Sequence, residues 1–125
     1  MTRLLTGLTL LGTLAVLAGT PAQAQAAGYD GLWSVLIITE QGTCDRGYRY
    51  AVRIKRGRVG HADPSSSSFN IQGRVGRGGG IKVSVIRGDK RANGSGHMNK
   101  TSGSGMWRSA KGECSGIWTA EKRGS

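Results

Sequence analysis

The sequence predicts an all-β protein, either a small antiparallel up-and-down barrel or a flattened sandwich of about eight short strands with one disulfide. Three observations point to this class. Apolar and polar residues alternate with a period of two along most of the chain, as they do in strands with one face on a core. Glycine-rich and Asx-rich turn signals separate these runs. No long stretch has the spacing of an amphipathic helix.

The expected strands follow from this alternation, taken in chain order. The clearest run is 48–54, in which apolar and mostly cationic residues alternate, and 69–75 and 81–85 repeat the pattern. Turn signals at Arg56-Gly57, at 78–80 and at Gly88-Asp89 separate the runs. We therefore expect strands at 31–40, 47–56, 58–62, 68–76, 80–87, 90–98, 103–109 and 114–122.

The two cysteines favour the barrel. Cys44 follows the first expected strand and Cys114 opens the last one. In a closed meander of eight strands the first and last strands are antiparallel neighbours, so the two cysteines would meet. A flattened sandwich could also bring them together. A disulfide closing so long a loop would contribute about 4 kcal/mol in the chain-entropy model.

The first 24 residues have the features of a secretory signal peptide. Arg3 supplies the positive start, an apolar run covers 4–18, and Ala22-Gln23-Ala24 is a small-x-small cleavage site. We expect one domain at 25–125, exported to the periplasm or beyond the cell. That oxidising setting suits a disulfide.

Each tryptophan in the chain follows a glycine by two residues, as in Gly105-Met106-Trp107. Residues two apart share one face of a strand, so these glycines make room for bulky rings on that face. Either the indoles fill a narrow interior, which we favour, or they line a ligand pocket. The candidate pocket residues are Trp33, Tyr48, Tyr50, Trp107 and Trp118.

The chain is strongly basic, with a formal net charge of +11. Such a field attracts an anionic polymer or a membrane surface. The alternative is a solubilising shell of cations along the strands. Specific DNA binding is not expected of an exported protein. The candidate anion-binding residues are Arg49, Arg53, Lys55, Arg56, Arg58, Arg74, Arg77 and Lys82.

The first expected strand is apolar on both faces, because Leu32, Leu36 and Ile38 alternate with other apolar residues. Its outer face would be covered by a protein partner or by the loop at 65–68.

We expect neither catalytic residues nor a metal or other cofactor. Nothing in the sequence predicts a catalytic triad at His61 or His97. His97 and Met98 would point to opposite faces of a strand, so both could not easily ligate one haem iron. Gly112-Glu113-Cys114-Ser115-Gly116 has the spacing of a nucleophile elbow, but a strand follows it instead of a helix.

Two resemblances add to these expectations. Gly31-Leu32-Trp33 on a first strand resembles the calycin pattern of lipocalins and avidins. YDGLWSVLI, CDRGYRYAVRI, SGSGMWRS and CSGIWTAEKR together resemble a group of small exported bacterial proteins of unknown function, some labelled for haem utilisation or adhesion. We therefore expect a secreted, non-enzymatic protein that binds anionic envelope or extracellular polymers. The alternatives are a small-ligand carrier, with haem as one candidate, and a periplasmic enzyme inhibitor.

Overall fold

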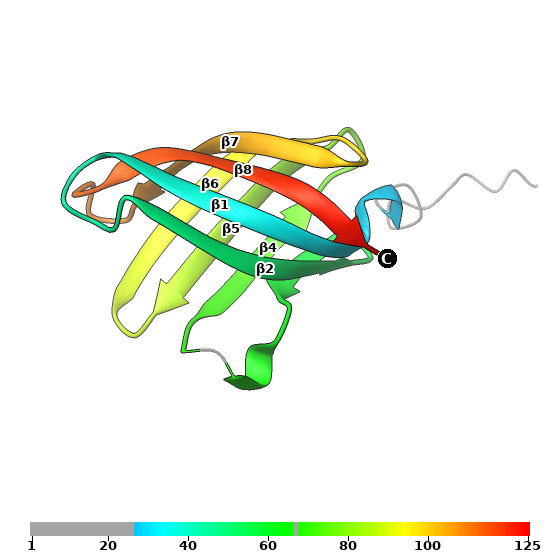
Figure 1. Ribbon diagram of the computed structural model, residues 1–125, viewed down its shortest axis with the longest axis horizontal. Coiled ribbons are helices and arrows are strands. Elements are labelled where there is room, and N and C mark those ends of the chain that lie inside the picture. Colours follow the sequence, from blue (N-terminus) through cyan, green and yellow to red (C-terminus); the bar gives the residue numbers. More distant parts are fainter. Residues whose placement is uncertain (1–26, 67) are drawn as a thin grey trace, which may run out of the picture.

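The computed structural model describes residues 27–66 and 68–125, and the predicted signal peptide lies outside these residues. Within them, eight antiparallel strands follow one another around a closed barrel (Figure 1). The predicted barrel is thus confirmed. The strands are β1 (Gly31–Gln41), β2 (Gly47–Lys55), β3 (Arg58–His61), β4 (Asn70–Val75), β5 (Gly80–Arg87), β6 (Lys90–Met98), β7 (Ser102–Ser109) and β8 (Ser115–Gly124). Two 3-10 turns, η1 (Ala27–Tyr29) and η2 (Pro64–Ser66), precede β1 and β4.

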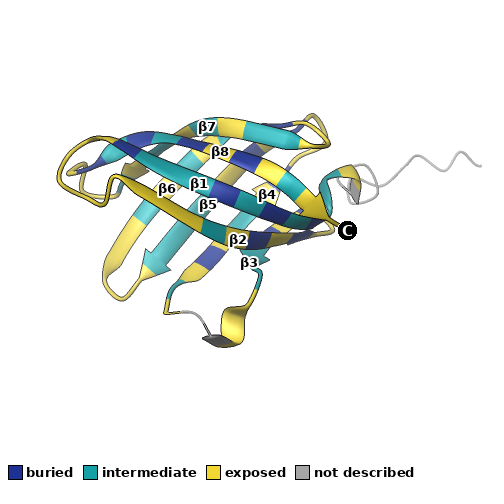
Figure 2. Ribbon diagram, viewed as in Figure 1, coloured by how far each residue is buried: buried dark blue, intermediate teal, exposed yellow. Residues whose placement is uncertain are grey.

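Burial alternates along the strands as the sequence pattern predicts (Figure 2). In β2, for example, Val52 and Ile54 are buried while Arg53 and Lys55 are exposed. The buried apolar residues form one cluster inside the barrel. Within the described residues, no helix has the length and apolar character needed to span a membrane.

The barrel closes where β1 pairs with β8, and the register of this pair shifts near each end. One shift lies between Leu32 and Trp33, beside Gly31. Gly31 has a φ of 140°, and a Cβ there would lie 2.8 Å from Cε of Lys122. Glycine is therefore required at this position, both for its backbone conformation and for the close approach of β8.

The predicted disulfide joins Cys44, on the turn after β1, to Cys114, just before β8. The two Cα atoms lie 6.2 Å apart, and Cys114 is almost fully buried. The amide of Cys114 donates to the hydroxyl of Ser109 at 2.8 Å, which holds the start of β8 against the end of β7. The disulfide thus joins the β1–β2 turn to the β7–β8 turn at one end of the barrel.

The opposite end of the barrel is closed by η1 and by short turns. The indole N–H of Trp33, a side chain with no exposed surface, donates to the carbonyl of Tyr29 in η1 at 2.8 Å. The carboxylate of Asp30 accepts hydrogen bonds from the amides of Arg56 (2.7 Å) and Gly57 (3.2 Å) in the β2–β3 turn. We call this the closed end.

Candidate ligand-binding cavity

The barrel interior is packed by the buried apolar cluster towards the closed end, and towards the disulfide it holds a cavity of about 700 Å³. The expectation of a filled interior is therefore wrong for the part of the barrel near the disulfide. The physical reason is the small size of the inward-facing residues on β5 and β6, which include Val83, Val85, Ala92 and Gly94. The indoles do not span the space that these residues leave.

The cavity opens at the end of the barrel that carries the disulfide. Its wall continues to the turns that join β1 to β2, β5 to β6 and β7 to β8. We call this end the mouth. Residues of the mouth that border the cavity include Asp45, Asp89, Lys90, Lys111 and Glu113. The mouth therefore carries charges of both signs, while the wall below it is mostly apolar.

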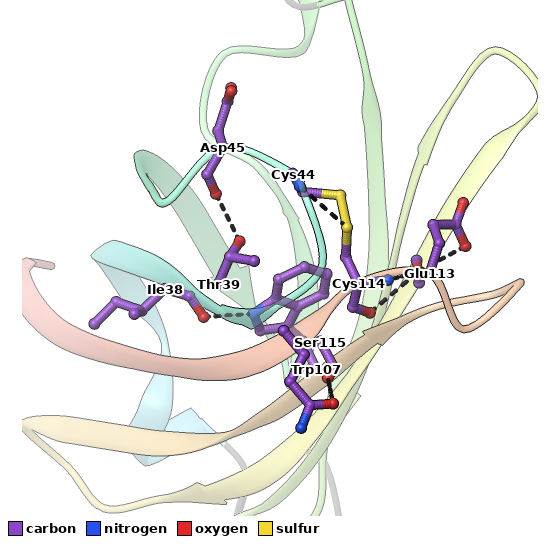
Figure 3. Close-up of a disulfide and its surroundings, with 10 residues drawn as sticks. Ile38, Thr39, Cys44, Asp45, Trp107, Glu113, Cys114 and Ser115 are labelled. Carbon is purple, nitrogen blue, oxygen red and sulfur yellow. Dashed lines mark hydrogen bonds between the residues drawn. A yellow bond between two sulfur atoms is a disulfide. The ribbon is translucent and has the colours of Figure 1, made fainter.

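All five predicted pocket residues line this cavity: Trp33, Tyr48, Tyr50, Trp107 and Trp118. The indole N–H of Trp107 donates to the carbonyl of Ile38 at 3.0 Å (Figure 3). That of Trp118 donates to the carbonyl of Ser95 at 3.1 Å. Because backbone carbonyls hold these N–H groups, the rings are fixed in place and present their apolar surfaces to the interior.

The glycines near the tryptophans make room across strands rather than within one strand. Gly96 on β6 pairs directly with Gly105 on β7. A Cβ on either glycine would lie 2.7 Å from an atom of the Trp118 indole on β8. A Cβ on Gly116 would collide with the carbonyl of Ile38, the group that accepts the Trp107 hydrogen bond. The glycines thus set the positions of two cavity-lining rings.

A cluster of aromatic rings lies on the β2 side of the mouth. The ring of Phe69, just before β4, lies 5.7 Å from that of Tyr50, 6.3 Å from that of Tyr48 and 4.9 Å from that of His61. The guanidinium of Arg87 lies 5.8 Å from the centre of the Phe69 ring. Tyr48, Tyr50, Phe69 and Arg87 form one wall of the entrance, and His61 packs against the Phe69 ring without lining the cavity.

Sequence reasoning missed Phe69 and Arg87 as parts of this site. The signal for Arg87 was present, because it follows inward-facing Val83 and Val85 with the same period of two. Phe69 precedes β4 and reaches the tyrosines of β2 only through the fold. No local pattern connects residues so far apart in the chain.

Tyr50 has the most perturbed phenol in the cavity. Burial, with a smaller effect from neighbouring Tyr48, raises the pKa of Tyr50 to about 12. The phenol is therefore neutral at physiological pH. Within the described residues its hydroxyl has no protein hydrogen-bond partner, so it is available to a bound molecule.

Glu113 lies at the rim of the mouth, where its carboxylate accepts a hydrogen bond from the Ser109 hydroxyl at 2.9 Å. The pKa of this carboxyl is lowered by its own backbone amide, by Ser109 and by the nearby cations Lys111 and Lys90. The carboxylate thus stays charged and partly offsets the positive rim.

None of the eight predicted anion-binding residues lines the cavity. Four of them, Lys55, Arg58, Arg74 and Lys82, occupy directly opposed positions on β2, β3, β4 and β5. The others are more scattered.

Arg49 turns towards β1, where its guanidinium donates to the hydroxyl of Ser34 at 2.9 Å. Arg53 lies opposite Leu32 of β1 and Gly60 of β3. Arg56 and Arg77 lie in turns at the closed end. The basic set is therefore one ordered row with several outliers.

Residues 27–66 and 68–125 contain no group of three or more His, Cys, Asp or Glu side chains that could hold a metal ion. His97 is exposed on the outer face while its neighbour Met98 is buried inside the barrel. The two residues thus point to opposite faces, as their positions on one strand predicted.

No family model matches this chain, and comparisons with curated proteins and with solved structures give no significant match. The resemblances to calycins and to small exported bacterial proteins therefore stay predictions.

Proposed function

We propose that the barrel binds one small, largely apolar molecule in its interior. The observation that carries this proposal is the cavity of about 700 Å³ lined by fixed aromatic rings. Ligand pockets of proteins typically enclose about 300–1,000 Å³ and bear a few polar groups on an apolar wall. An eight-stranded barrel is also just wide enough to hold one small ligand.

The polar groups of the wall limit what the ligand would look like. The indole N–H groups of the three tryptophans are occupied by backbone carbonyls. The hydroxyls of Tyr48 and Tyr50 line the cavity near the mouth, and neither makes a protein hydrogen bond within the described residues. The phenol of Tyr50 is the more buried of the two. We therefore expect an apolar body, with its own polar group placed near Tyr50 and the mouth.

Titration monitored by tryptophan fluorescence tests the proposal. A suitable panel contains a long-chain fatty acid, a polycyclic aromatic compound and haem, which covers the haem-carrier alternative. Because Trp107 and Trp118 line the cavity, a ligand that enters it should change their emission. If no member of the panel changes the emission or binds by calorimetry, the proposed function is wrong.

A matched pair of variants locates the binding. Ala92 faces the cavity, whereas Ala51 is exposed on the outer face of β2 opposite Ser34. Ala92→Phe should fill part of the cavity and weaken ligand binding by about tenfold or more. Ala51→Phe should leave the affinity unchanged. Equal weakening by both variants would contradict binding inside the barrel.

The ligand's polar group can be tested separately. Tyr50→Phe removes the more buried of the two hydroxyls and leaves the ring in place. Affinity should fall by about three- to tenfold for a ligand with a hydrogen-bonding group and stay unchanged for a pure hydrocarbon. The same loss for both ligands would contradict a hydrogen bond from Tyr50.

A further inference from the structure

The outer face of the barrel carries a row of cations that nothing in the fold requires. Lys55 lies directly opposite Arg58, Arg58 opposite Arg74, and Arg74 opposite Lys82. All four side chains are exposed. Like charges in directly opposed positions destabilise a sheet. In the described part of the chain the one ion pair joins Arg123 to Glu121, so no carboxylate is paired with the row.

A shallow trough runs across the strands beside this row. Its floor is backbone, because the residues next to the row point into the barrel. These residues are Val59, Gly73, Val83 and Gly94, which oppose one another in register on β3, β4, β5 and β6. Arg58, Arg74 and Lys82 form one wall of the trough.

The opposite wall is neutral and polar. Gln72, Ser84 and Asn93 oppose one another there, one residue along each strand from the floor and two from the cationic wall. Ser95, which lies opposite Lys82, ends the cationic wall. The hydroxyl of Ser84 donates to the side-chain oxygen of Asn93 at 2.8 Å. This bond orients the Asn93 amide, whose NH₂ group remains a donor towards the trough.

We propose that this trough binds an acidic polysaccharide. Arginine and lysine pair with carboxylate or sulfate groups, and amide and hydroxyl side chains pair with sugar hydroxyls. The trough presents both sets side by side on neighbouring strands. A linear glycan with repeating acidic groups matches a row of cations set one strand apart, about 4.8 Å at the backbone.

The same chemistry disfavours the other polyanions. Single-stranded nucleic acid is held through aromatic side chains on which the bases stack, and no aromatic residue lines the trough. A membrane surface is bound through cations together with apolar groups that enter the lipid. The outward-facing side chains of the trough are charged or polar. Among anionic polymers, the acidic polysaccharide is therefore favoured.

This inference does not rest on the interior cavity, because none of the cations of the trough lines the cavity. The two sites share only strand residues between them, namely Val59, Val83, Asn93 and Gly94. Loss of polysaccharide binding should leave the fluorescence response to a cavity ligand intact, and the reverse should also hold.

The test compares the affinities of the disulfide-bonded protein for polymers of known composition. Heparin fragments and polygalacturonate supply sulfate and carboxylate groups, dextran is the neutral control, and poly-dT and phosphatidylglycerol vesicles are the competing polyanions. We expect calorimetric binding to both acidic glycans that weakens as NaCl rises from about 50 to about 300 mM. No binding to either glycan, or tighter binding to poly-dT or to vesicles at equal charge, would overturn the proposal.

Charge-matched variants separate the trough from the overall field. Replacing Arg58, Arg74 and Lys82 with Gln should weaken glycan binding by about tenfold or more. The control replaces Arg46, Arg91 and Lys100, which are exposed bases outside the trough, with Gln and should change affinity by less than about threefold. Equal losses in the two triple variants would contradict a defined site.

A second pair of substitutions tests the neutral wall at constant charge. Gln72→Ala with Asn93→Ala should weaken glycan binding by about threefold or more, because two hydrogen-bonding groups are removed. An unchanged affinity would contradict sugar recognition. Folding is checked by near-ultraviolet circular dichroism and thermal unfolding. The midpoint of the Arg58, Arg74 and Lys82 variant should stay the same or rise, because opposed like charges are removed.

Discussion

The closed end of the barrel is held by short turns, buried side chains and backbone hydrogen bonds, whereas the mouth carries longer connections, a disulfide and half-exposed rings. At the closed end, Trp33 is fully buried and Asp30 joins the start of β1 to the β2–β3 turn. At the mouth, Tyr48 is 41% exposed although it lines the cavity. The closed end is thus held by packing and hydrogen bonds, while the mouth is held by the disulfide and leaves the cavity accessible.

Truncation of Trp33 should give the largest effect on stability. Trp33→Ala removes a fully buried indole and its hydrogen bond to Tyr29, and should lower the free energy of unfolding by about 3–5 kcal/mol. Denaturant titration measures the loss. Hydrogen exchange should accelerate first in η1 and at the start of β1. An equal acceleration at the mouth would show that the two ends are not energetically distinct.

Removal of the disulfide should have the next largest effect, located at the mouth. Cys44→Ser with Cys114→Ser should lower the free energy of unfolding by about 2–4 kcal/mol. Wild-type protein measured in reducing agent should match the variant and so serves as its control. Hydrogen exchange should accelerate in the β1–β2 turn and at the start of β8, while exchange in η1 and at the start of β1 stays unchanged. Unchanged exchange at the mouth would contradict this location.

Alkaline pH should produce the smallest effect, and it arises at Tyr50. The phenol of Tyr50 ionises near pH 12 in the folded chain and near pH 10 once exposed by unfolding. Between these values the unfolded chain has lost a proton that the folded chain keeps. The free energy of unfolding should therefore fall as pH rises through this window, and this contribution should be fully present below it.

Comparison with Tyr50→Phe isolates this contribution. The variant should lose less stability than wild type between pH 10 and pH 12, because its ring has no proton to release. Denaturant titrations across that range measure the difference. Parallel pH profiles of the two proteins would contradict the burial of the Tyr50 phenol. They would show that water reaches this part of the cavity wall from the mouth.

Much of the fold could be predicted from the sequence because its determinants are local. The alternation at 48–54 predicts β2 within one residue at its C-terminal end, and Arg56-Gly57 predicts the turn that follows. The cysteines predicted the closing pair, since Cys44 and Cys114 flank β1 and β8. β4 begins at Asn70, two residues after the predicted start.

The hollow interior could not be predicted in the same way. The space inside a barrel depends on how small residues on different strands align, as Gly96 and Gly105 do beside Trp118. Strand parity predicted that five aromatic rings face inward, and all five line the cavity. It did not predict that these rings leave part of the interior empty, nor that the ring of Phe69 would contact that of Tyr50 at the entrance.

The pairing of β1 with β8 has a consequence for how the protein can be attached to something else. Leu32 lies opposite Gly124, so the chain enters and leaves the barrel at the closed end, beside η1 (Figure 1). A tether fused either before β1 or after β8 would therefore be attached at the closed end, and the mouth would point away from it. A short linker between the two ends would also give a circular permutant, with new termini opened in any turn that does not carry the disulfide.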